Sequence, residues 1–220
     1  MSDKPPELVI DHQRERRTGV PEIVFGATKT AAQIAAALRE LAEDGAAIAT
    51  RVDGAKADEV RRLVSDVVVH ELARVLTLGS VSRPACAPIA VVCAGTSDLP
   101  VAEEAAIVAE FLGAPVVRIA DVGVAGLHRL LARLDDIRAC EVVIAVAGME
   151  AALPSVLGGL IDKPMIAVPT SVGYGVSVDG LVALGALLAA CAPGIAIVNI
   201  DNGVGAAVAA VRIARLAVRR

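Results

Sequence analysis

Four cysteines and three histidines are the residues of this 220-residue chain best suited to covalent or proton-transfer chemistry. Cys191 closes an apolar stretch, a position where a cysteine usually packs as a small buried hydrophobe. The cysteines at 86, 93, 140 and 191 form neither a CxxC pair nor a metal-binding spacing. Spacing by itself therefore assigns no cysteine a reactive role.

Polar and glycine residues gather in five short segments, each of which follows an apolar run. These segments are residues 94–100, 121–129, 147–150, 169–177 and 199–203. In the first, Ser97 or Asp98 is suited to cap a following helix, and Pro100 suits its first turn. The same loop, with Thr96, offers hydroxyls and free N–H groups that would cradle a phosphate or another anion. The two roles are compatible, and the sequence favours neither.

The second and third segments carry candidate acid–base groups. Gly123 lets the backbone approach a ligand closely, while His128 and Arg129 could supply proton transfer and charge. The glycine spacing does not match a dinucleotide-binding fingerprint, and a single histidine is more often structural than catalytic. Glu150, which follows Gly148 and an apolar run, suits either a general base or an ordinary acidic residue at a helix start.

The fourth and fifth segments are rich in hydrogen-bonding groups. Thr170 and Ser171 stand among glycines, a composition typical of a turn and also suited to contacts with a ribose or phosphate. Asn199 and Asp201 follow a very apolar run in a region that is otherwise poor in polar groups. These four residues are therefore candidate binding residues.

The elements that must position these segments are strands and helices in alternation. Five short runs rich in Val, Ile and Ala are apolar without alternation, which is typical of strands buried on both faces. Helical stretches of roughly a dozen residues separate them, so we predict a mainly parallel sheet with helices on both sides, an α/β domain. Ligands bind beyond the carboxyl ends of such strands, where the polar segments lie. The runs are 88–94, 115–120, 141–147, 164–168 and 195–200.

The first part of the chain has a different character, with frequent charges and irregular elements. We predict a polar, extended or loosely ordered segment over 1–20, a small α+β domain over 21–84, and the α/β domain over 85–220. Within the small domain, a helix should begin at Thr30 and end before Gly45. Strands are expected at 21–26 and 46–52, a helix at 55–63, and one long or two short strands over 66–78.

Composition excludes several classes of protein. Hydrophobic residues make up 55% of the chain and the mean hydropathy is +0.65, but Pro193 and Gly194 interrupt the best candidate span, 180–200. A membrane protein is therefore not expected. The net charge of −4 and only three aromatic residues argue against nucleic-acid binding. The first residues lack an apolar signal segment, so we expect a cytoplasmic protein with reduced thiols.

From about residue 20 onward the chain resembles the LarB family, carboxylase/hydrolases of nickel-pincer nucleotide cofactor biosynthesis that are related to PurE-type aminoimidazole ribonucleotide carboxylases. Several long motifs in the same order carry the resemblance, which makes it specific. They lie at 24–33, 94–98, 121–129, 147–150, 168–175 and 199–203. The resemblance implies a PurE-like three-layer domain and a homo-oligomer, an octamer, to which apolar helices such as 180–191 would contribute contacts.

The resemblance also implies a reaction. The pyridinium ring of nicotinic acid adenine dinucleotide would be carboxylated at C5 by CO2 or bicarbonate, and its phosphoanhydride hydrolysed. The position that matches the family's ring-attacking cysteine is Cys191, which requires a thiolate. Glu150 matches the base near the ring, and His128 the PurE-type catalytic histidine. Mg²⁺ is implied for the phosphates, with Asp121 or Asp201 as candidate contacts.

The implied binding residues extend to both domains. Lys29, with Thr30 and Gln33, would hold the adenosine half of the dinucleotide. Because aromatic residues are scarce, we expect the ring to be held by a covalent bond, backbone and polar loops rather than by stacking. The implied substrate-binding set is Lys29, Thr96, Ser97, Asp98, Gly123, Arg129, Gly148, Thr170, Ser171, Asn199 and Asp201.

Two other functions remain open at the level of sequence. One is a PurE-type carboxylase or mutase acting on aminoimidazole ribonucleotide, which would leave Cys191 and the first domain without a role. The other is a non-catalytic nucleotide-binding partner in cofactor assembly, in which Cys191 would be dispensable.

Overall fold

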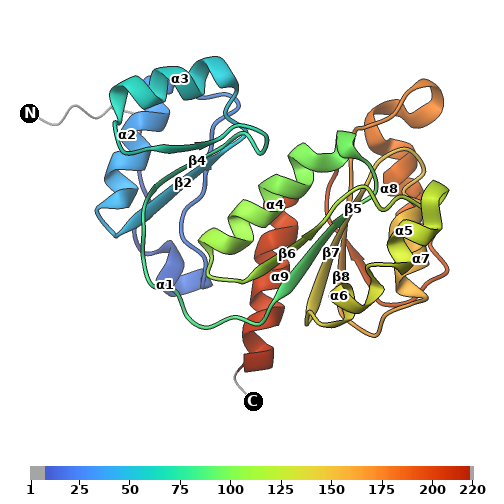
Figure 1. Cartoon of the computed structure of the whole chain (residues 1–220). Helices are drawn as coiled ribbons and strands as arrows, with labels where there is room; N and C mark the ends of the chain where they lie inside the picture. Colours follow the sequence, from blue (N-terminus) through green and yellow to red (C-terminus); the bar gives the residue numbers. More distant parts are fainter. Residues whose placement is uncertain (1–7, 219–220) are drawn as a thin grey trace, which may run out of the picture. The chain divides into compact units, whose positions relative to one another are not determined.

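The computed structural model describes residues 8–218 of the chain (Figure 1). The chain divides into two compact units, one that ends at Arg83 and one that begins at Pro84. Each unit has its own hydrophobic core. Part of the predicted polar segment over 1–20, namely residues 1–7, lies outside the described residues, as do residues 219–220.

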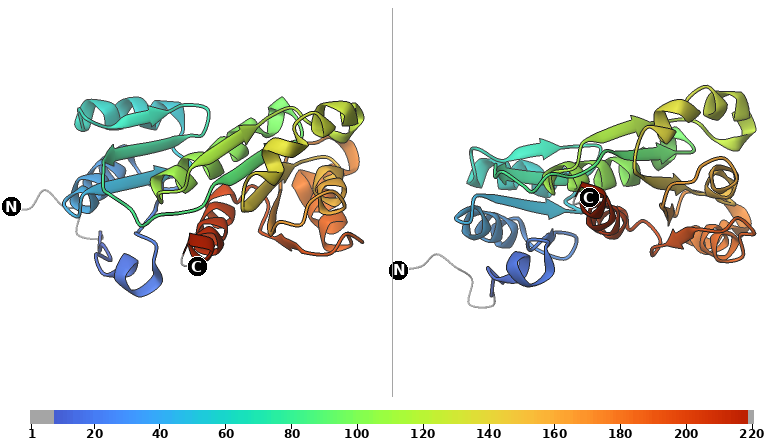
Figure 2. Two further views of the ribbon diagram at one scale, coloured as in Figure 1. Left: turned by 60° about the horizontal axis from the view of Figure 1, so that its bottom comes forward. Right: turned by 90° about the horizontal axis from the view of Figure 1, so that it is seen from below.

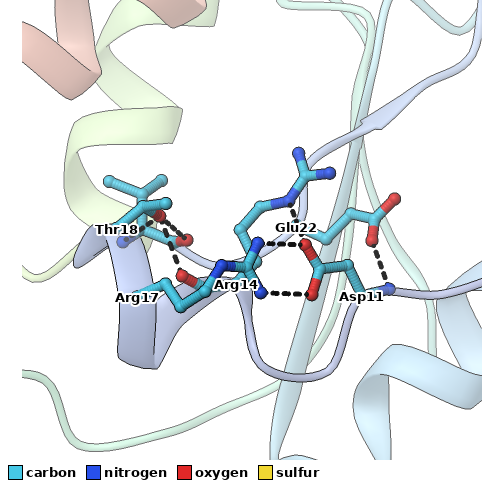
Figure 3. A network of polar contacts seen from close by, with 6 residues as sticks. Asp11, Arg14, Arg17, Thr18 and Glu22 are labelled. Carbon is cyan, nitrogen blue, oxygen red and sulfur yellow. Dashed lines mark hydrogen bonds and ion pairs between the residues drawn. The ribbon is translucent and has the colours of Figure 1, made fainter.

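A short helix replaces the extended segment that was expected before residue 20. Helix α1 spans Arg14–Thr18, and Asp11 accepts hydrogen bonds from the side chains of Arg14 at 3.3 Å and Arg17 at 2.8 Å (Figure 3). The backbone N–H of Asp11 donates to Glu22 at 2.7 Å. The hydrogen bond from Arg17 lowers the pKa of Asp11 to about 2. For residues 14–18, the expectation of an extended or loosely ordered segment is wrong, because Arg14 and Arg17 of this helix pair with the carboxylate of Asp11.

The first unit contains a mixed four-stranded sheet. The strand order is β1-β2-β4-β3, with β1 parallel to β2 and the other two pairs antiparallel. The predicted stretch 66–78 is two short strands, β3 and β4, because a turn at residues 71–74 separates them. The bounds are Val24–Phe25 for β1, Ala46–Thr50 for β2, Val68–His70 for β3 and Val75–Gly79 for β4.

Helices α2 (Ala31–Ala42) and α3 (Gly54–Leu63) pack on this sheet. Thr30 caps α2: its hydroxyl accepts from the Gln33 amide at 3.2 Å, and the Gln33 side chain accepts from the Thr30 amide at 3.0 Å. The predicted apolar face of α2 is buried in the core of the unit. Thr30 and Gln33, which the resemblance assigns to the dinucleotide, are thus occupied in starting the helix.

The second unit holds a five-stranded parallel sheet in the order β6-β5-β7-β8-β9, which confirms the predicted α/β class. The chain runs from β5 to one neighbour, β6, and then to the other, β7. The sheet therefore has a topological switch point between β5 and β7. The strands are β5 (Ile89–Cys93), β6 (Val116–Ile119), β7 (Val142–Ala147), β8 (Met165–Pro169) and β9 (Ile195–Ile197).

Helices cover both faces of this sheet (Figure 2). Helices α4 and α9 pack side by side on one face, and the four short helices α5 to α8 pack on the other. The short helices have five to eight residues, fewer than the predicted dozen. The bounds are α4 Leu99–Phe111, α5 Leu127–Leu131, α6 Leu134–Arg138, α7 Ala152–Gly158, α8 Leu181–Leu188 and α9 Gly203–Val218.

Small aliphatic residues explain the high hydropathy. All six residues of β7 are buried, and α4 and α9 meet through alanines such as Ala105, Ala109, Ala206 and Ala210, all fully buried. Alanines let helices approach a sheet closely, so the apolar excess is packed in the core of the domain. Among residues 8–218, no helix is long and apolar enough to cross a membrane.

Candidate active site

A pocket of about 510 Å³ opens at the carboxyl ends of four strands, β5 to β8. It lies at the switch point between β5 and β7, where open parallel sheets bind ligands. Five predicted site residues line it: Ser97, Asp98, Gly123, Gly148 and Glu150. The loops that follow four different strands thus converge on one cavity.

Asp98 is a buried carboxyl group in the wall of this pocket, with 4% of its surface exposed. One oxygen accepts from the hydroxyl of Thr170 at 2.7 Å, and the other accepts from the amide of Gly95 at 3.0 Å. Neither Ser97 nor Asp98 caps α4 with its side chain, so that prediction is wrong. Asp98 instead ties the loop after β5 to Thr170, which lies fully buried directly after β8.

The environment of Asp98 favours its protonated form. Burial raises the pKa of Asp98, and the hydrogen bonds from Thr170, Gly95 and Gly148 oppose this rise only in part. A carboxyl group that keeps its proton more readily than a free aspartate, and that borders a cavity, is suited to donate a hydrogen bond or a proton to a ligand.

The loop after β7 is strained where it borders the pocket. Met149 and Ala151 have φ angles of 52° and 48°, a conformation that costs free energy in residues other than glycine. Between them stands Glu150, exposed and lining the cavity. Gly148 has no room for a side chain, because a Cβ there would lie 2.6 Å from the Thr170 hydroxyl oxygen. This tightly packed loop places Glu150 in the lining of the pocket.

The loop after β6 contributes backbone rather than acid–base groups. A Cβ on Gly123 would lie 2.9 Å from the Ala94 carbonyl oxygen, so glycine is required there. Arg129 is ion-paired with Asp121, and His128 is exposed on α5. Neither His128 nor Arg129 lines the pocket.

Polar residues of the last two segments shape their own loops. The amide of Ser171 donates to Asp201 at 2.8 Å, and the side chain of Asn199 accepts from the amide of Ile200 at 2.9 Å. Asn202 accepts from the amide of Gly205 at 2.8 Å and caps α9. The side chains of Asn199 and Asp201 are therefore engaged with backbone amides, and none of the candidates Ser171, Asn199 and Asp201 lines the pocket.

The two metal candidates do not form a joint site. Asp121 follows β6 and Asp201 follows β9, the two edge strands of the sheet, so one ion cannot contact both. Within the described part of the chain, no group of three or more histidine, cysteine or acidic side chains is placed to hold a metal ion. The side chains present thus do not fit a resident Mg²⁺ site.

Comparison with known proteins agrees with this architecture. Residues 88–220 match the AIR carboxylase family, and residues 7–80 match the family described as LarB/PurE-like N-terminal domain. The chain belongs to the AIR carboxylase family and is of the LarB type. Its second unit is accordingly a carboxylase-type enzyme domain.

Relatives of this LarB-type chain fall into two groups. The uncharacterized protein MJ0165 of Methanocaldococcus jannaschii is 40% identical over 220 residues, which is 95% of this chain and 84% of that protein. An N5-carboxyaminoimidazole ribonucleotide mutase of the same organism is 36% identical over 58% of this chain and 79% of its own length. A mutase of that name from Pyrococcus horikoshii is 31% identical over 57% and 71%.

The cysteine that the LarB resemblance singles out lies away from the pocket. Cys191 is exposed and sits between α8 and β9, at the edge of the sheet where the strands begin. The thiol nearest to the pocket along the chain is Cys93, the buried last residue of β5, whose Sγ lies 3.6 Å from the Gly95 carbonyl oxygen. Burial raises the pKa of Cys93, so that thiol is poorly suited to attack.

Sequence reasoning missed several apolar residues of the pocket. Met149 and Tyr174 line it, and Tyr174 is the chain's one tyrosine, with 80% of its surface exposed at the rim. An aromatic side chain thus stands on the rim, while the expectation that the ring is held without stacking stays a prediction. The position of Tyr174 between Gly173 and Gly175, in a loop that follows a strand, was the sequence feature that could have revealed it.

Proposed function

We propose that this LarB-type chain carboxylates C5 of the pyridinium ring of nicotinic acid adenine dinucleotide and hydrolyses its phosphoanhydride. The products are pyridinium-3,5-dicarboxylate mononucleotide and AMP, for nickel-pincer nucleotide cofactor synthesis. The main support is one combination: a carboxylase-type domain whose switch-point pocket holds Glu150 and Asp98, joined to a LarB-type first domain.

A thiolate solves the central chemical difficulty of this reaction. The pyridinium ring is electron-poor and does not attack CO2. When the thiolate of Cys191 adds to C4, the S–C4 bond forms and a ring electron pair moves onto nitrogen, which leaves C5 nucleophilic as in an enamine. C5 then bonds to the carbon of CO2. A base removes the proton from C5, the C4–C5 double bond forms, and the thiolate departs with the S–C4 pair.

The pocket residues have distinct parts in this proposal. Glu150 is the base that removes the C5 proton, since it is exposed, lines the cavity and stands between two residues in left-handed backbone conformations. Asp98, buried and inclined to keep a proton, donates a hydrogen bond to the new carboxylate. Ser97 and the backbone at Gly123 and Gly148 suit contacts with CO2 or phosphate oxygens. Because His128 is outside the lining, we give it no part.

The test is to incubate the full chain with nicotinic acid adenine dinucleotide, bicarbonate and Mg²⁺, and to determine the product masses. We expect the gain of one carboxylate on the nicotinate half together with release of AMP. Cys191→Ala should lower the rate by about a hundredfold or more, because it removes the nucleophile. Cys86→Ala, a thiol outside the pocket lining, is the matched control and should retain the wild-type rate. Full activity of Cys191→Ala would contradict the covalent mechanism.

A second candidate function follows from the two mutases that resemble the second unit. In this alternative the chain moves a carboxylate on aminoimidazole ribonucleotide, and Cys191 has no role. Offering N5-carboxyaminoimidazole ribonucleotide to the same preparation separates the two. Turnover of this nucleotide, with none of the dinucleotide, would establish the alternative and overturn the proposal.

A further inference from the structure

The one tyrosine of the chain stands at the mouth of the pocket and has no role in the proposed reaction. Tyr174 belongs to the loop after β8 and lines the cavity, yet 80% of its surface is exposed. A large side chain with this exposure has little packing of its own, so the face of its ring is available to a ligand. The inference drawn from Tyr174 rests on the function proposed for this pocket.

The backbone around Tyr174 is tied to its neighbours. The amide of Ser177 donates to the Tyr174 carbonyl oxygen at 3.2 Å and closes a turn, and Ser177 itself is buried. The amide of Met149 donates to the Val172 carbonyl oxygen at 2.8 Å, which joins the loop after β7 to the loop after β8. Glu150, next to Met149, and Tyr174 therefore line one cavity from two loops that are bonded to each other.

The charge of the pocket is a second, independent observation. Among the described residues that line it, none is a lysine, arginine or histidine, and the acidic ones are Asp98 and Glu150. Arg129 on α5 is paired with Asp121 and lies outside the lining. Most of the other lining residues are apolar, such as Leu153. A cavity with these walls favours an organic cation over an anion.

A tyrosine face and a carboxylate in one cavity are suited to a flat ring that carries a positive charge. The face of an aromatic ring has a negative electrostatic potential, which attracts a cation lying over it. We propose that Tyr174 binds the pyridinium ring of the substrate through its aromatic face, and that Tyr174 and Glu150 make the pocket selective for a charged ring. Stacking then contributes to binding, contrary to the expectation drawn from the scarcity of aromatic residues.

The contribution of Tyr174 falls on substrate binding rather than on the chemical steps. When the thiolate adds to C4 in the proposed reaction, the ring loses its positive charge and its attraction to the Tyr174 face weakens. An interaction that is stronger in the bound substrate than in the intermediate lowers KM without raising kcat. Damage to the structure of the pocket would instead lower kcat, so these two constants separate ring binding from a structural role.

The composition of the chain provides a direct measurement. Because the chain has no tryptophan and one tyrosine, its tyrosine fluorescence comes from Tyr174 alone. We expect nicotinic acid mononucleotide, which carries the charged ring, to quench this fluorescence to a saturable limit. Its uncharged analogue, a 3-carboxyphenyl C-nucleotide with carbon in place of the ring nitrogen, should bind about tenfold more weakly. Equal binding of the two nucleotides, or quenching that never saturates, would overturn the inference.

Substitutions of Tyr174 test whether its aromatic face is the binding group. Tyr174→Phe keeps the ring and should bind the mononucleotide within about twofold of the wild-type chain, whereas Tyr174→Ala should bind about tenfold more weakly. Calorimetry measures these affinities, since both variants lack the tyrosine. Val176→Ala is the matched control and should bind like the wild-type chain, because Val176 is exposed in the same loop but outside the lining. Unchanged affinity in Tyr174→Ala would overturn the inference.

Glu150→Gln tests the charge of the pocket separately, because glutamine keeps the shape of the side chain and removes its charge. Binding of the charged mononucleotide should weaken, while binding of the uncharged analogue should stay within about twofold of the wild-type value. If the preference for the charged ring were the same in this variant as in the wild-type chain, Glu150 would have no part in the selectivity, and the inference would be wrong on that point.

Turnover of the dinucleotide distinguishes failure of this inference from failure of the proposed function. If the wild-type chain converts the dinucleotide, Tyr174→Ala should raise KM about tenfold and change kcat by less than about twofold. An unchanged KM, or a loss confined to kcat, would overturn the inference and leave the proposed function intact. If the wild-type chain does not convert the dinucleotide, the proposed function fails, whereas the binding of charged and uncharged rings still decides the role of Tyr174.

Discussion

At the scale of single residues, the contact between Asp98 and Thr170 organises the pocket. It joins the loops after β5 and β8 through one hydrogen bond of 2.7 Å between two buried side chains. Burial disfavours the charged carboxylate, as the raised pKa of Asp98 indicates. The hydroxyl of Thr170 counters part of that cost, so the pair should affect both stability and its pH dependence.

Replacing Thr170 with the isosteric valine removes the hydroxyl group and leaves a buried carboxyl oxygen of Asp98 without its hydrogen-bond donor. Near neutral pH we expect the free energy of unfolding to fall by about 1–3 kcal/mol. Because the folded pKa of Asp98 is raised, its favourable contribution is present below its unfolded pKa, near 4, and is lost as the pH rises through the folded value. The loss in Thr170→Val should therefore be smaller at acidic pH.

Urea unfolding of the wild-type chain and Thr170→Val at several pH values measures this difference. Thr96→Val, which alters an exposed hydroxyl in the loop bound by Asp98, is the control and should change stability little. If the loss of stability in Thr170→Val did not vary with pH, the hydrogen bond from Thr170 would not be coupled to the protonation of Asp98.

The residue scale also shows how far sequence reasoning reached. Placing polar segments after apolar runs located the pocket, because strand ends in a parallel sheet share one edge. It did not foresee that the side chains of Asp201 and Asn199 would accept from the backbone amides of Ser171 and Ile200. Ser97 or Asp98 was predicted to cap a helix or to contact a ligand, but the side chain of Asp98 binds Thr170, 72 positions away. Such a contact depends on the register of strands and leaves no trace in local spacing.

At the scale of elements, the strained loop after β7 is the part of the fold that most directly positions the base. Met149 and Ala151 adopt left-handed backbone conformations on either side of Glu150. The apolar run before the loop predicted β7 correctly, since strands buried on both faces have no alternation. The strain itself was not predictable, because alanine and methionine give no local preference for it.

Gly148→Ala tests the tightness of this loop. A Cβ there would collide with the Thr170 hydroxyl oxygen, 2.6 Å away, and with the Val172 carbonyl. We expect the free energy of unfolding to fall by about 1–3 kcal/mol, because a side chain is forced into a filled space. Gly54→Ala is the matched control: it starts α3 and has open space around it, so it should be neutral or stabilising. Equal stabilities of the two variants in urea unfolding would contradict the structure of the loop.

At the scale of the whole molecule, the chain comprises two units with separate cores. The change in composition near residue 80 reflects this arrangement, because the first unit builds a small mixed sheet and the second a parallel sheet. Hydropathy was the misleading quantity, since most of the apolar excess is buried alanine and valine of the second unit. The large apolar side chains that remain exposed are spread over both units, and three of them, Leu181, Val182 and Leu188, lie on α8.

Separate cores predict separate unfolding transitions, and His12 should identify the one that belongs to the first unit. Its ring lies 2.8 Å from Asp44 and 3.3 Å from Glu40, and the hydrogen bond to Asp44 raises its pKa. The resulting stabilisation is present below the unfolded pKa, near 6.5, and is lost as the pH rises through the folded value. The first unit should therefore unfold at a lower urea concentration near pH 8 than near pH 6. The difference in its free energy of unfolding should be less than about 1 kcal/mol, because the pair is exposed. His12→Gln should abolish this shift.

Circular dichroism of the full chain and of a fragment comprising residues 84–220 makes the comparison. The fragment should unfold cooperatively, because its core is complete without the first unit. Its midpoint should equal that of the second unit in the full chain, which is the transition that His12→Gln leaves unchanged. The full chain could instead show a single transition that shifts as a whole with the protonation of His12. That result would mean that the two cores unfold together. In that case the first unit would be part of the scaffold of the carboxylase-type domain, and its loss would remove the pocket as well.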